Sequence, residues 1–291
     1  MGIGGALGAS EAVALLSRTT GEPYQLAGRL SGGETGAHRV LAPGGRPLVV
    51  KWDSVPRNRE LRAEALTLSE RLRTEGGWPV PRQWAIDAGE CLFVVQEFMA
   101  GAPIELLSHA VVDRILQLHA VRIGLARPGD PDHWPSALLR TLTLGCEGYC
   151  RHESLRQHDR RTALLVARIE EFGRSISEAD LPGTDIVHWD LHPGNLLGDE
   201  GGLTAIVDTD FAVVGDAAFD LVMLALASLA VPCAPGVRTR LFTEAFDDLG
   251  ELPAQAYLAH LFVRLLDWPI RRGRSDEIQF WLDRAEGMLT V

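Results

Sequence analysis

The most informative part of the chain is the sequence VHWDLHPGNLL at residues 187–197, followed by AIVD at residues 205–208. A short apolar run opens the first segment and another closes the second, and both are typical of buried strands. The Pro-Gly pair between them predicts a turn. Asp190, Asn195 and Asp208 follow these runs or lie in the turn. A tight loop between two short strands is therefore expected to bring two carboxylates and one amide into one cleft.

The spacing within this loop indicates a specific chemistry. Asp190 lies five residues before Asn195, as in the D-x-x-x-x-N pattern of protein-kinase catalytic loops, and Asp208 ends an apolar run. Phosphoryl transfer needs a carboxylate at the attacking hydroxyl, and an amide oxygen and a second carboxylate to hold Mg²⁺ against the phosphates. Such spacings are frequent by chance, but the combination with His188, the turn and Asp208 is specific. The segment predicts phosphoryl transfer.

Residues nearer the N-terminus supply the parts of a nucleotide site in the order that a kinase requires. The glycine-containing stretch 31–36 predicts a turn between strands, in which Ser31, Gly32 and Gly33 are candidates for contact with phosphates. Lys51 ends an apolar strand and is the single lysine among 28 basic residues. A compact ammonium reaches between phosphate oxygens where a planar guanidinium is too wide. The exceptional lysine therefore favours a phosphate contact.

Each of these features also has an ordinary structural explanation. Hairpin glycines usually serve only the turn, and a lysine at a strand edge usually only adds solubility. Glu60 and Glu64 lie on the helix predicted over 57–73, where exposed glutamates are usually solvated. Taken singly, these explanations suffice. Their occurrence in kinase order, with the single lysine in the required place, favours the nucleotide site.

The chain is predicted to contain a small strand-rich part and a larger helical part. Apolar patterns and glycine-containing turns predict strands at 26–30, 38–42, 47–52, 82–87 and 91–97. Beyond Gly101 the apolar spacing is mostly helical, over 105–121, 136–178, 217–231, 237–249 and 254–290. We therefore expect a β-rich N-terminal unit of residues 1–101 and a mainly helical C-terminal unit of residues 102–291.

With these features the chain resembles the aminoglycoside phosphotransferases and their choline-kinase-like relatives. The resemblance covers most of the chain and rests on the 188–195 loop and Asp208, together with Pro79-Val80-Pro81, Leu118-His119, Gly215-Asp216 and Asp220-Leu221. It implies an α+β, two-lobed protein-kinase-like fold. It also implies ATP and Mg²⁺ as cofactors and a hydroxyl group of a small molecule as the phosphoryl acceptor.

The resemblance further implies roles at the catalytic centre. Asp190 would be the catalytic base, and Asn195 and Asp208 would be the metal ligands. Two positions depart from the family pattern: Trp189 stands where the family usually has glycine or another small residue, and Thr209 stands where an aromatic residue commonly follows the metal-binding aspartate. A large ring beside the base would narrow the acceptor side or stack on the acceptor. Neither departure removes a catalytic group.

For the nucleotide, the resemblance implies that Lys51 contacts the α- and β-phosphates. Glu64 would hold this lysine, with Glu60 as the second choice. The backbone of a hinge segment would meet the adenine. The remaining cofactor-binding candidates, from the phosphate loop and the hinge, are Ser31, Gly32, Gly33, Glu97 and Met99.

Composition narrows the cellular setting and the partners. The chain has 28 Lys+Arg and 39 Asp+Glu, a net charge of −11, which disfavours nucleic acid and favours cationic small molecules. The start lacks the pattern of a signal peptide, and the longest apolar stretch, 221–233, is far shorter than the ~20 residues that span a bilayer. Four cysteines form no C-x-x-C pair. We expect a cytoplasmic protein with reduced thiols and no membrane partner.

The acceptor is the least specified part of this interpretation. Acidic residues are scattered over the helical part, and the family places the acceptor between an insert around residues 130–180 and the C-terminal helices. The expected function is phosphorylation of a cationic antibiotic, either an aminoglycoside or a peptide of the viomycin and capreomycin type, which would give resistance by inactivation. Macrolides, choline, homoserine and methylthioribose stay open as alternative acceptors. The sequence leaves the oligomeric state undecided.

Two other functional classes were weighed. His188, Asp190 and His192 alternate, so on an extended segment they would share one face and could bind Zn²⁺ or a pair of metal ions for hydrolysis. The Pro-Gly pair breaks such a strand, and a hydrolase leaves Lys51 unexplained. A regulatory pseudokinase is disfavoured because every catalytic position is filled.

Overall fold

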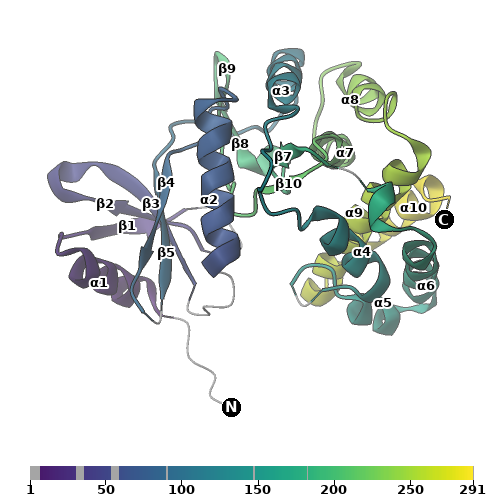
Figure 1. The fold of residues 1–291 in the computed structure, drawn as a ribbon, viewed down its shortest axis with the longest axis horizontal. Coiled ribbons are helices and arrows are strands. Elements are labelled where there is room, and N and C mark those ends of the chain that lie inside the picture. Colours follow the sequence, from purple (N-terminus) through teal and green to yellow (C-terminus); the bar gives the residue numbers. More distant parts are fainter. Residues whose placement is uncertain are drawn as a thin grey trace. The chain divides into compact units, whose positions relative to one another are not determined.

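The computed structural model describes six stretches of the chain, namely residues 7–30, 36–53, 59–89, 91–146, 148–181 and 183–290. Internal contacts divide the chain into two compact units. The first unit comprises residues 1–125 and 188–212, and the second comprises residues 126–187 and 213–291. The elements of each unit can be followed in Figure 1. The predicted class, α+β with a β-rich beginning and a mainly helical remainder, is confirmed.

The first unit is built on a five-stranded antiparallel sheet. The strand order is β1-β2-β3-β5-β4. The strands are β1 (Gln25–Arg29), β2 (His38–Leu41), β3 (Pro47–Asp53), β4 (Gln83–Asp87) and β5 (Leu92–Glu97). Because β3 lies between β2 and β5, its register is held from both sides, and Lys51 lies opposite Val94. Alternate apolar residues of β3 and β5, including Leu48 and Phe93, point into the core of this unit.

Helix α1 (Ala9–Thr20) covers this core and was not among the predicted elements. Its buried residues Ala12, Val13 and Leu16 pack into the same apolar cluster as the sheet. The helix ends at Gly21, whose φ of 73° is the left-handed conformation that glycine adopts without a steric penalty. Helix α2 (Arg59–Thr74) matches its predicted span and packs against β4.

A second, three-stranded sheet brings the 188–212 segment into the first unit. Its strands, in spatial order, are β6 (Ala102–Pro103), β8 (Leu196–Asp199) and β9 (Gly202–Ile206), and helix α3 (His109–Arg122) contacts β9. Gly101 precedes β6 with a φ of 129°, and a Cβ atom there would lie 2.7 Å from Thr204 Oγ1. The compact unit therefore extends beyond the expected boundary at residue 101, because β6 is hydrogen-bonded to β8.

The second unit is mainly helical. Its helices are α4 (Trp134–Leu144), α5 (His152–His158), α6 (Arg160–Ser175), α7 (Ala218–Ala227), α8 (Val237–Phe246), α9 (Glu251–Arg272) and α10 (Ser275–Met288). A two-stranded sheet joins β7 (Asp185–Val187) to β10 (Val213–Gly215). Trp134, Phe219 and Tyr257 meet edge to face, with ring centroids 5.1–5.7 Å apart, at the centre of this unit.

Two of the spans with predicted helical spacing each contain more than one helix. The span 136–178 contains three helices, because Gly145 ends α4 at a φ of 73° and the side chain of Asp159 caps α6. The span 254–290 contains two helices, because Gly273 ends α9 in the left-handed conformation. Helix α7 is buried along almost its whole length, as its apolar sequence predicts. Within the described part of the chain, no helix is both long and apolar enough to cross a membrane.

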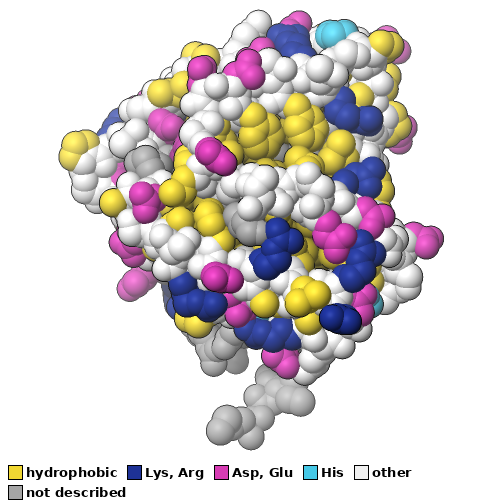
Figure 2. Space-filling model, turned by 90° about the vertical axis from the view of Figure 1, so that its right-hand side faces the viewer, with side chains coloured by type: hydrophobic (Ala, Val, Ile, Leu, Met, Phe, Trp, Pro, Cys, Tyr) yellow, Lys and Arg dark blue, Asp and Glu magenta, His cyan; other side chains and the backbone are white. Residues whose placement is uncertain are grey.

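The outer surface carries charges of both signs. In the view of Figure 2, arginine and acidic side chains are mixed with apolar ones and do not form one acidic patch. Several charged side chains of the second unit are ion-paired. Arg161 Nη2 lies 2.8 Å from Asp283 and 2.6 Å from Glu286, and Arg274 lies 3.1 Å from Glu277. Surface pairs of this kind add little stability, but they neutralise part of the negative charge locally.

Candidate active site

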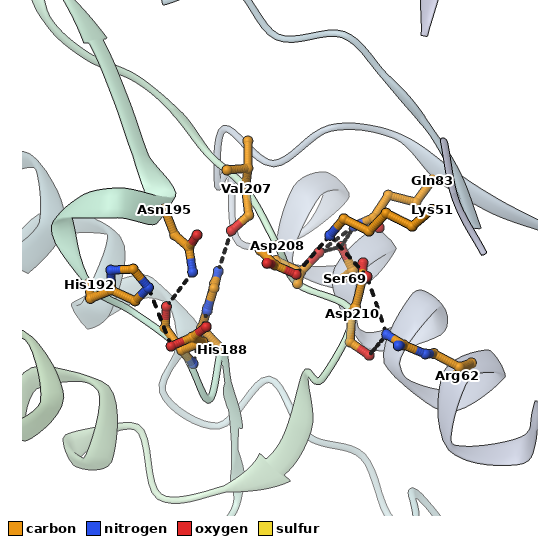
Figure 3. A network of polar contacts seen from close by, with 12 residues as sticks. Lys51, Arg62, Ser69, Gln83, His188, His192, Asn195, Val207, Asp208 and Asp210 are labelled. Carbon is orange, nitrogen blue, oxygen red and sulfur yellow. Dashed lines mark hydrogen bonds and ion pairs between the residues drawn. The ribbon is translucent and has the colours of Figure 1, made fainter. Parts of the chain in front are cut away.

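A buried histidine, His188, fixes the start of the 188–195 loop (Figure 3). His188 Nε2 donates to the carbonyl oxygen of Val207 at 3.0 Å, and its Nδ1 accepts from the amide of Asp190 at 3.2 Å. One nitrogen donates and the other accepts, which is the pattern of a neutral imidazole. His188 therefore joins the loop to the residue before Asp208, and both nitrogens are used in doing so.

Asp190 lies at the surface of this loop and is held from two sides. Asn195 Nδ2 donates to the backbone oxygen of Asp190 at 2.9 Å, and His192 Nε2 lies 3.5 Å from Asp190 Oδ1. The other ring nitrogen of His192 accepts from the amide of Gly194 at 3.1 Å. The side chain of Asp190 is 19% exposed. The carboxylate thus has a defined orientation and remains accessible from solvent.

The single lysine of the chain meets two aspartates of the 205–210 segment. Lys51 Nζ lies 2.8 Å from Asp208 Oδ1 and 3.0 Å from Asp210 Oδ2. Burial opposes the charged ammonium, but the carboxylates of Asp210 and Asp208 outweigh it and raise the pKa of Lys51. The side chain of Asp208 is 31% exposed, whereas that of Asp210 is 3% exposed. Asp208 is therefore the more accessible of the two carboxylates.

Helix α2 supplies a second cation to this group. Arg62 Nη1 lies 3.2 Å from Asp210 Oδ2 and donates to the backbone oxygen of Asp210 at 3.0 Å. Its guanidinium also lies over the ring of Phe211, 4.5 Å from the centroid. Asp210 is thus bound by Lys51 from β3 and by Arg62 from α2. These contacts anchor the segment that follows Asp208 to both the sheet and the helix.

Thr209 joins the same segment to two further elements. Its hydroxyl lies 2.7 Å from the hydroxyl of Ser69 on α2, and Gln83 Nε2 on β4 donates to both hydroxyls, at 2.9 Å to that of Ser69. Thr209 is fully buried and Ser69 is 1% exposed. A buried hydroxyl is costly unless it is hydrogen-bonded, and this position offers the partners. The departure from an aromatic residue at Thr209 therefore has a structural reason.

Two residues of the site adopt a backbone conformation that side chains disfavour. Among the described residues other than glycine, only Trp189 and Asp208 have positive φ, at 73° and 68°. The left-handed region costs a residue with a Cβ roughly 1–2 kcal/mol, and strained residues of this kind cluster at functional sites. The φ of Trp189 is also the physical reason why glycine suits that position. The chain retains tryptophan there despite the strain.

The donors near the loop suit a hard cation. The side-chain nitrogen of Asn195 is used in the hydrogen bond to the Asp190 backbone, so the side-chain oxygen of Asn195 is the atom that can bind a cation. Asp208 adds a partly exposed carboxylate. Mg²⁺ is commonly bound by one or two carboxylates, with phosphates and water completing its octahedron. In the described stretches, no group of three or more His, Cys, Asp and Glu side chains could hold a metal ion. The donor set thus fits Mg²⁺ shared with a phosphate-bearing ligand.

Some of the predicted site residues lie outside the stretches that the structure describes. Ser31, Gly32 and Gly33 lie outside the described residues, within the connection between β1 and β2. Glu97 ends β5 and Met99 lies between β5 and β6, where the chain leaves the five-stranded sheet. The contacts that define the position of Lys51 are those to Asp208 and Asp210, so a pairing with Glu64 of α2 stays a prediction.

Four residues of the site did not emerge from the sequence. Asp210 had a signal, since it lies two positions after Asp208 and matches it in charge. The others, Arg62, Ser69 and Gln83, had none, because their partners lie 126–148 positions away along the chain. His192 was considered only as a metal ligand, yet it contacts the carboxylate of Asp190.

Comparisons with known proteins bear on the family and the fold of the chain. A model of the phosphotransferase enzyme family matches residues 28–267. The search of curated proteins finds no match to the chain. Among solved structures, the aminoglycoside phosphotransferase APH(4)-Ia is similar with a TM-score of 0.68 and 17% identity, covering 97% of this chain and 98% of that one.

Two further structures are similar over most of their length. A candidate fructosamine-3-kinase from Thermobifida fusca has a TM-score of 0.62 and 19% identity, over 98% of this chain and all of that one (100%). An amicoumacin kinase in complex with AMP-PNP and Ca²⁺ has a TM-score of 0.61 and 16% identity, over 90% of this chain and 88% of that one. At these identities the likeness establishes the fold, which is that of the small-molecule kinases.

Proposed function

The chain belongs to the phosphotransferase enzyme family, and from this membership we propose that it uses ATP to phosphorylate a hydroxyl group of a cationic small molecule. The observation that carries the proposal is the meeting of Lys51 with Asp208, 157 positions apart in the sequence, in the compact unit that also holds Asp190 and Asn195. A lysine, two carboxylates and an amide are the parts that phosphoryl transfer requires.

In the proposed mechanism Asp190 acts on the acceptor. Its carboxylate accepts a hydrogen bond from the acceptor hydroxyl, orients the oxygen towards the phosphorus, and takes the proton as the bond to phosphorus forms. The contact of His192 with one carboxylate oxygen favours a single orientation of the group. The hydrogen bond from Asn195 to the Asp190 backbone holds the loop at the same place.

On the nucleotide side, Lys51 would bind the α- and β-phosphates, and Asn195 and Asp208 would hold Mg²⁺. The bound metal ion would neutralise charge on the phosphate oxygens. The charged ammonium of Lys51 contacts the carboxylates of Asp208 and Asp210, so phosphate binding would replace contacts to carboxylate oxygens with contacts to phosphate oxygens. Glu97 and Met99 remain our candidates for adenine contact, and Glu64 for positioning Lys51.

We propose a cationic antibiotic as the acceptor, with inactivation of the compound as the outcome. The net charge of −11 supports a cationic ligand over an anionic one. The acidic residues are not equivalent, however. Asp267 is buried and paired with Arg271 at 2.9 Å, so it is unsuited to bind a ligand, whereas Asp247 and Asp248 are exposed at the end of α8. A thermostable mutant of the similar aminoglycoside phosphotransferase APH(4)-Ia has been solved with ADP and hygromycin B.

The decisive experiment is a transfer assay with ATP labelled at the γ-phosphate. Products would be separated by thin-layer chromatography after incubation with aminoglycosides, viomycin, capreomycin, a macrolide, an amicoumacin, a fructosamine, choline, homoserine and methylthioribose. Label in a cationic antibiotic supports the proposal. Label in choline, homoserine or methylthioribose alone would make the protein a metabolite kinase. ATP hydrolysis without a labelled product from any acceptor would not support the assignment, because water alone would then be the acceptor.

The metal assignment is tested by titrating activity against Mg²⁺. Asp208→Ala removes an anionic ligand and should raise the Mg²⁺ requirement more than Asn195→Ala, which removes a neutral oxygen that water can replace. The opposite ranking would contradict the assignment. Zinc retained after chelation, with activity independent of Mg²⁺, would support a hydrolase instead. Against that alternative stands the use of both His188 nitrogens within the protein.

The cationic character of the acceptor is tested by salt. The Debye length falls from about 30 Å at 0.01 M to about 8 Å at physiological ionic strength, so the KM of a polycationic acceptor should climb as KCl is added. The double variant Asp247→Asn/Asp248→Asn should flatten the climb if this pair faces the acceptor. Glu105→Gln/Glu200→Gln, which removes two exposed charges from the first unit, is the matched control. A KM that is indifferent to salt would contradict a cationic acceptor and leave the kinase assignment intact.

A further inference from the structure

The connection between α4 and α5 brings two cysteines together. Cys146 is exposed and Cys150 is buried, and both are free thiols. The amide of Cys146 donates to the carbonyl oxygen of Cys150 at 2.9 Å, which places the two Cα atoms within about 6.8 Å of each other. Cα atoms joined by disulfides are usually 4.4–6.8 Å apart. The separation of the two cysteines is therefore compatible with a disulfide.

The turn that brings the cysteines together depends on a glycine. Gly145 has a φ of 73°, and a Cβ atom at this position would lie 2.6 Å from the carbonyl oxygen of Cys150. A side chain is therefore excluded on both conformational and steric grounds. The close approach of the two cysteines is a built feature of the backbone.

The two sulfur atoms have different surroundings. The Cys150 thiol donates a hydrogen bond to Cys146, which is the main reason why the pKa of Cys146 is lowered to about 5; burial opposes this, and the amides of Gly148, Cys150 and Tyr149 add to the lowering. The same hydrogen bond, together with complete burial, raises the pKa of Cys150. One sulfur is thus an exposed thiolate and the other is a protonated thiol beside it.

Helix α9 holds the loop in this conformation. Arg271 donates to the backbone oxygen of Gly148 at 2.8 Å and is itself fixed by two 2.9 Å contacts to the buried carboxylate of Asp267. The ring of Tyr149 lies 5.4 Å from that of Trp268. These contacts attach Gly148 and Tyr149, which lie between the two cysteines, to α9.

We propose that Cys146 and Cys150 form a redox modification site that a hydroperoxide converts to a disulfide. The Cys146 thiolate attacks the outer peroxide oxygen, so that an S–O bond forms, the O–O bond breaks and the leaving alkoxide or hydroxide takes a proton from water. The sulfur of Cys150 then attacks Cys146, an S–S bond forms and the S–O bond breaks. The departing hydroxide and the proton of the Cys150 thiol leave as water. Two sulfur atoms lose one electron each, and the peroxide gains both.

The other two cysteines serve as internal controls. Cys91 is buried in the core of the first unit, and Cys233 is half-buried with its thiol directed to the Ser228 carbonyl oxygen at 3.5 Å. The arginines at 140 and 151 place both reactive cysteines in one tryptic peptide, Thr141–Arg151. Mass spectrometry can therefore assign the site directly.

The first experiment treats the folded protein with stoichiometric hydrogen peroxide, alkylates it and digests it with trypsin. We expect the Thr141–Arg151 peptide to lose two hydrogen atoms in mass and to resist alkylation, while the peptides of Cys91 and Cys233 are alkylated as in the untreated sample. Dithiothreitol should reverse the change. In Cys150→Ser, which cannot form the bond, dimedone should trap a sulfenic acid at Cys146. A peptide that keeps both thiols, or oxidation that begins at Cys91 or Cys233, would overturn the proposal.

The second experiment measures alkylation of Cys146 by iodoacetamide at pH 5.5. The larger thiolate fraction outweighs the lower intrinsic nucleophilicity, so the rate should exceed that of free cysteine by on the order of tenfold. Cys150→Ser keeps a hydrogen-bond donor and should retain most of this rate, whereas Cys150→Ala should lose it. A rate equal to that of free cysteine in the wild-type protein would overturn the proposal, and this measurement needs no variant to fold.

Discussion

Replacing Lys51 with methionine removes the cation that lies between Asp208 and Asp210. The change keeps an unbranched side chain of similar length on β3, so the strand register and the apolar stem are preserved. What is lost is the pair of contacts at 2.8 and 3.0 Å from the ammonium. The two carboxylates then face each other without the charge that separates them.

The size of the effect follows from burial. Lys51 is 14% exposed and Asp210 is 3% exposed, and removing one partner of a buried ion pair costs about 3–5 kcal/mol. Arg62, at 3.2 Å from Asp210, keeps part of the compensation, so we expect the lower end, about 3 kcal/mol. For a chain of this length, that loss corresponds to a fall in Tm of roughly 6–12 °C.

The assay is a double-mutant cycle without nucleotide, read by urea denaturation and by thermal melting. Asp210→Asn neutralises the more buried of the two carboxylates that contact Lys51, so Lys51→Met/Asp210→Asn should be more stable than the sum of the single losses predicts, by about 2 kcal/mol. Lys51→Arg is the matched control because it keeps the charge. It should melt near the wild type, yet lose kcat/KM for ATP if the ammonium reaches between phosphate oxygens.

Two results would refute this reasoning. Additive losses, within about 0.5 kcal/mol, would mean that Lys51 and Asp210 do not interact. An unchanged melting temperature in Lys51→Met would mean that the ion pair contributes nothing to stability. Wild-type kinetics in Lys51→Arg would leave the ion pair intact and count against the phosphate contact.

Three further predictions concern other parts of the chain. Asp190→Asn should lower kcat by about 10²–10⁴-fold while ATP binding, measured by calorimetry, is kept, because the carboxylate acts on the acceptor; near-native kcat would remove Asp190 from its assigned role. Thr209→Val leaves the Ser69 and Gln83 groups without their shared hydroxyl and should cost about 1–3 kcal/mol of unfolding free energy, whereas Thr209→Ser should cost much less; equal losses would contradict the hydrogen-bond network. Burial lowers the pKa of His260 to about 3 from the ordinary value of 6.5, so the unfolded chain binds a proton that the folded chain does not, and stability should fall by about 2 kcal/mol from pH 7 to pH 5. His260→Leu should flatten that part of the stability curve, and an unchanged slope would show that another group causes it.

Local patterns were sufficient for much of the fold and for the outline of the site. Alternation along β3 and β5 and the helical spacing of α2 appear within a few residues of sequence, because the periods of strands and helices are set by the backbone. The D-x-x-x-x-N spacing is likewise local, since one loop carries Asp190 and Asn195. The solitary Lys51 was recognisable by composition alone. These features need no knowledge of which segments meet.

The start and end of each helix were harder to predict from the sequence. Helix α1 was missed, although its residues Ala12, Val13 and Leu16 are buried, because the pattern is short and begins next to glycines. The long helical span 136–178 contains three helices, and the break at Gly145 depends on its contact with the Cys150 carbonyl oxygen. A glycine within a helical pattern does not by itself say whether the helix ends there.

Which side chains meet depends on how distant segments of the chain pack together. Asp210 pairs with Lys51 across 159 positions of sequence, and Thr209 meets Ser69 across 140. Such contacts depend on how the three-stranded sheet and α2 pack against the β3 region, and no spacing along the chain encodes that packing. The left-handed backbone at Trp189 and Asp208 has the same origin, since a strained conformation persists only where the surrounding structure holds it. The chemical groups and their local order are readable along the chain, whereas their partners are set by the packing of distant segments, because ion pairs and hydrogen bonds form only at distances that folding brings about.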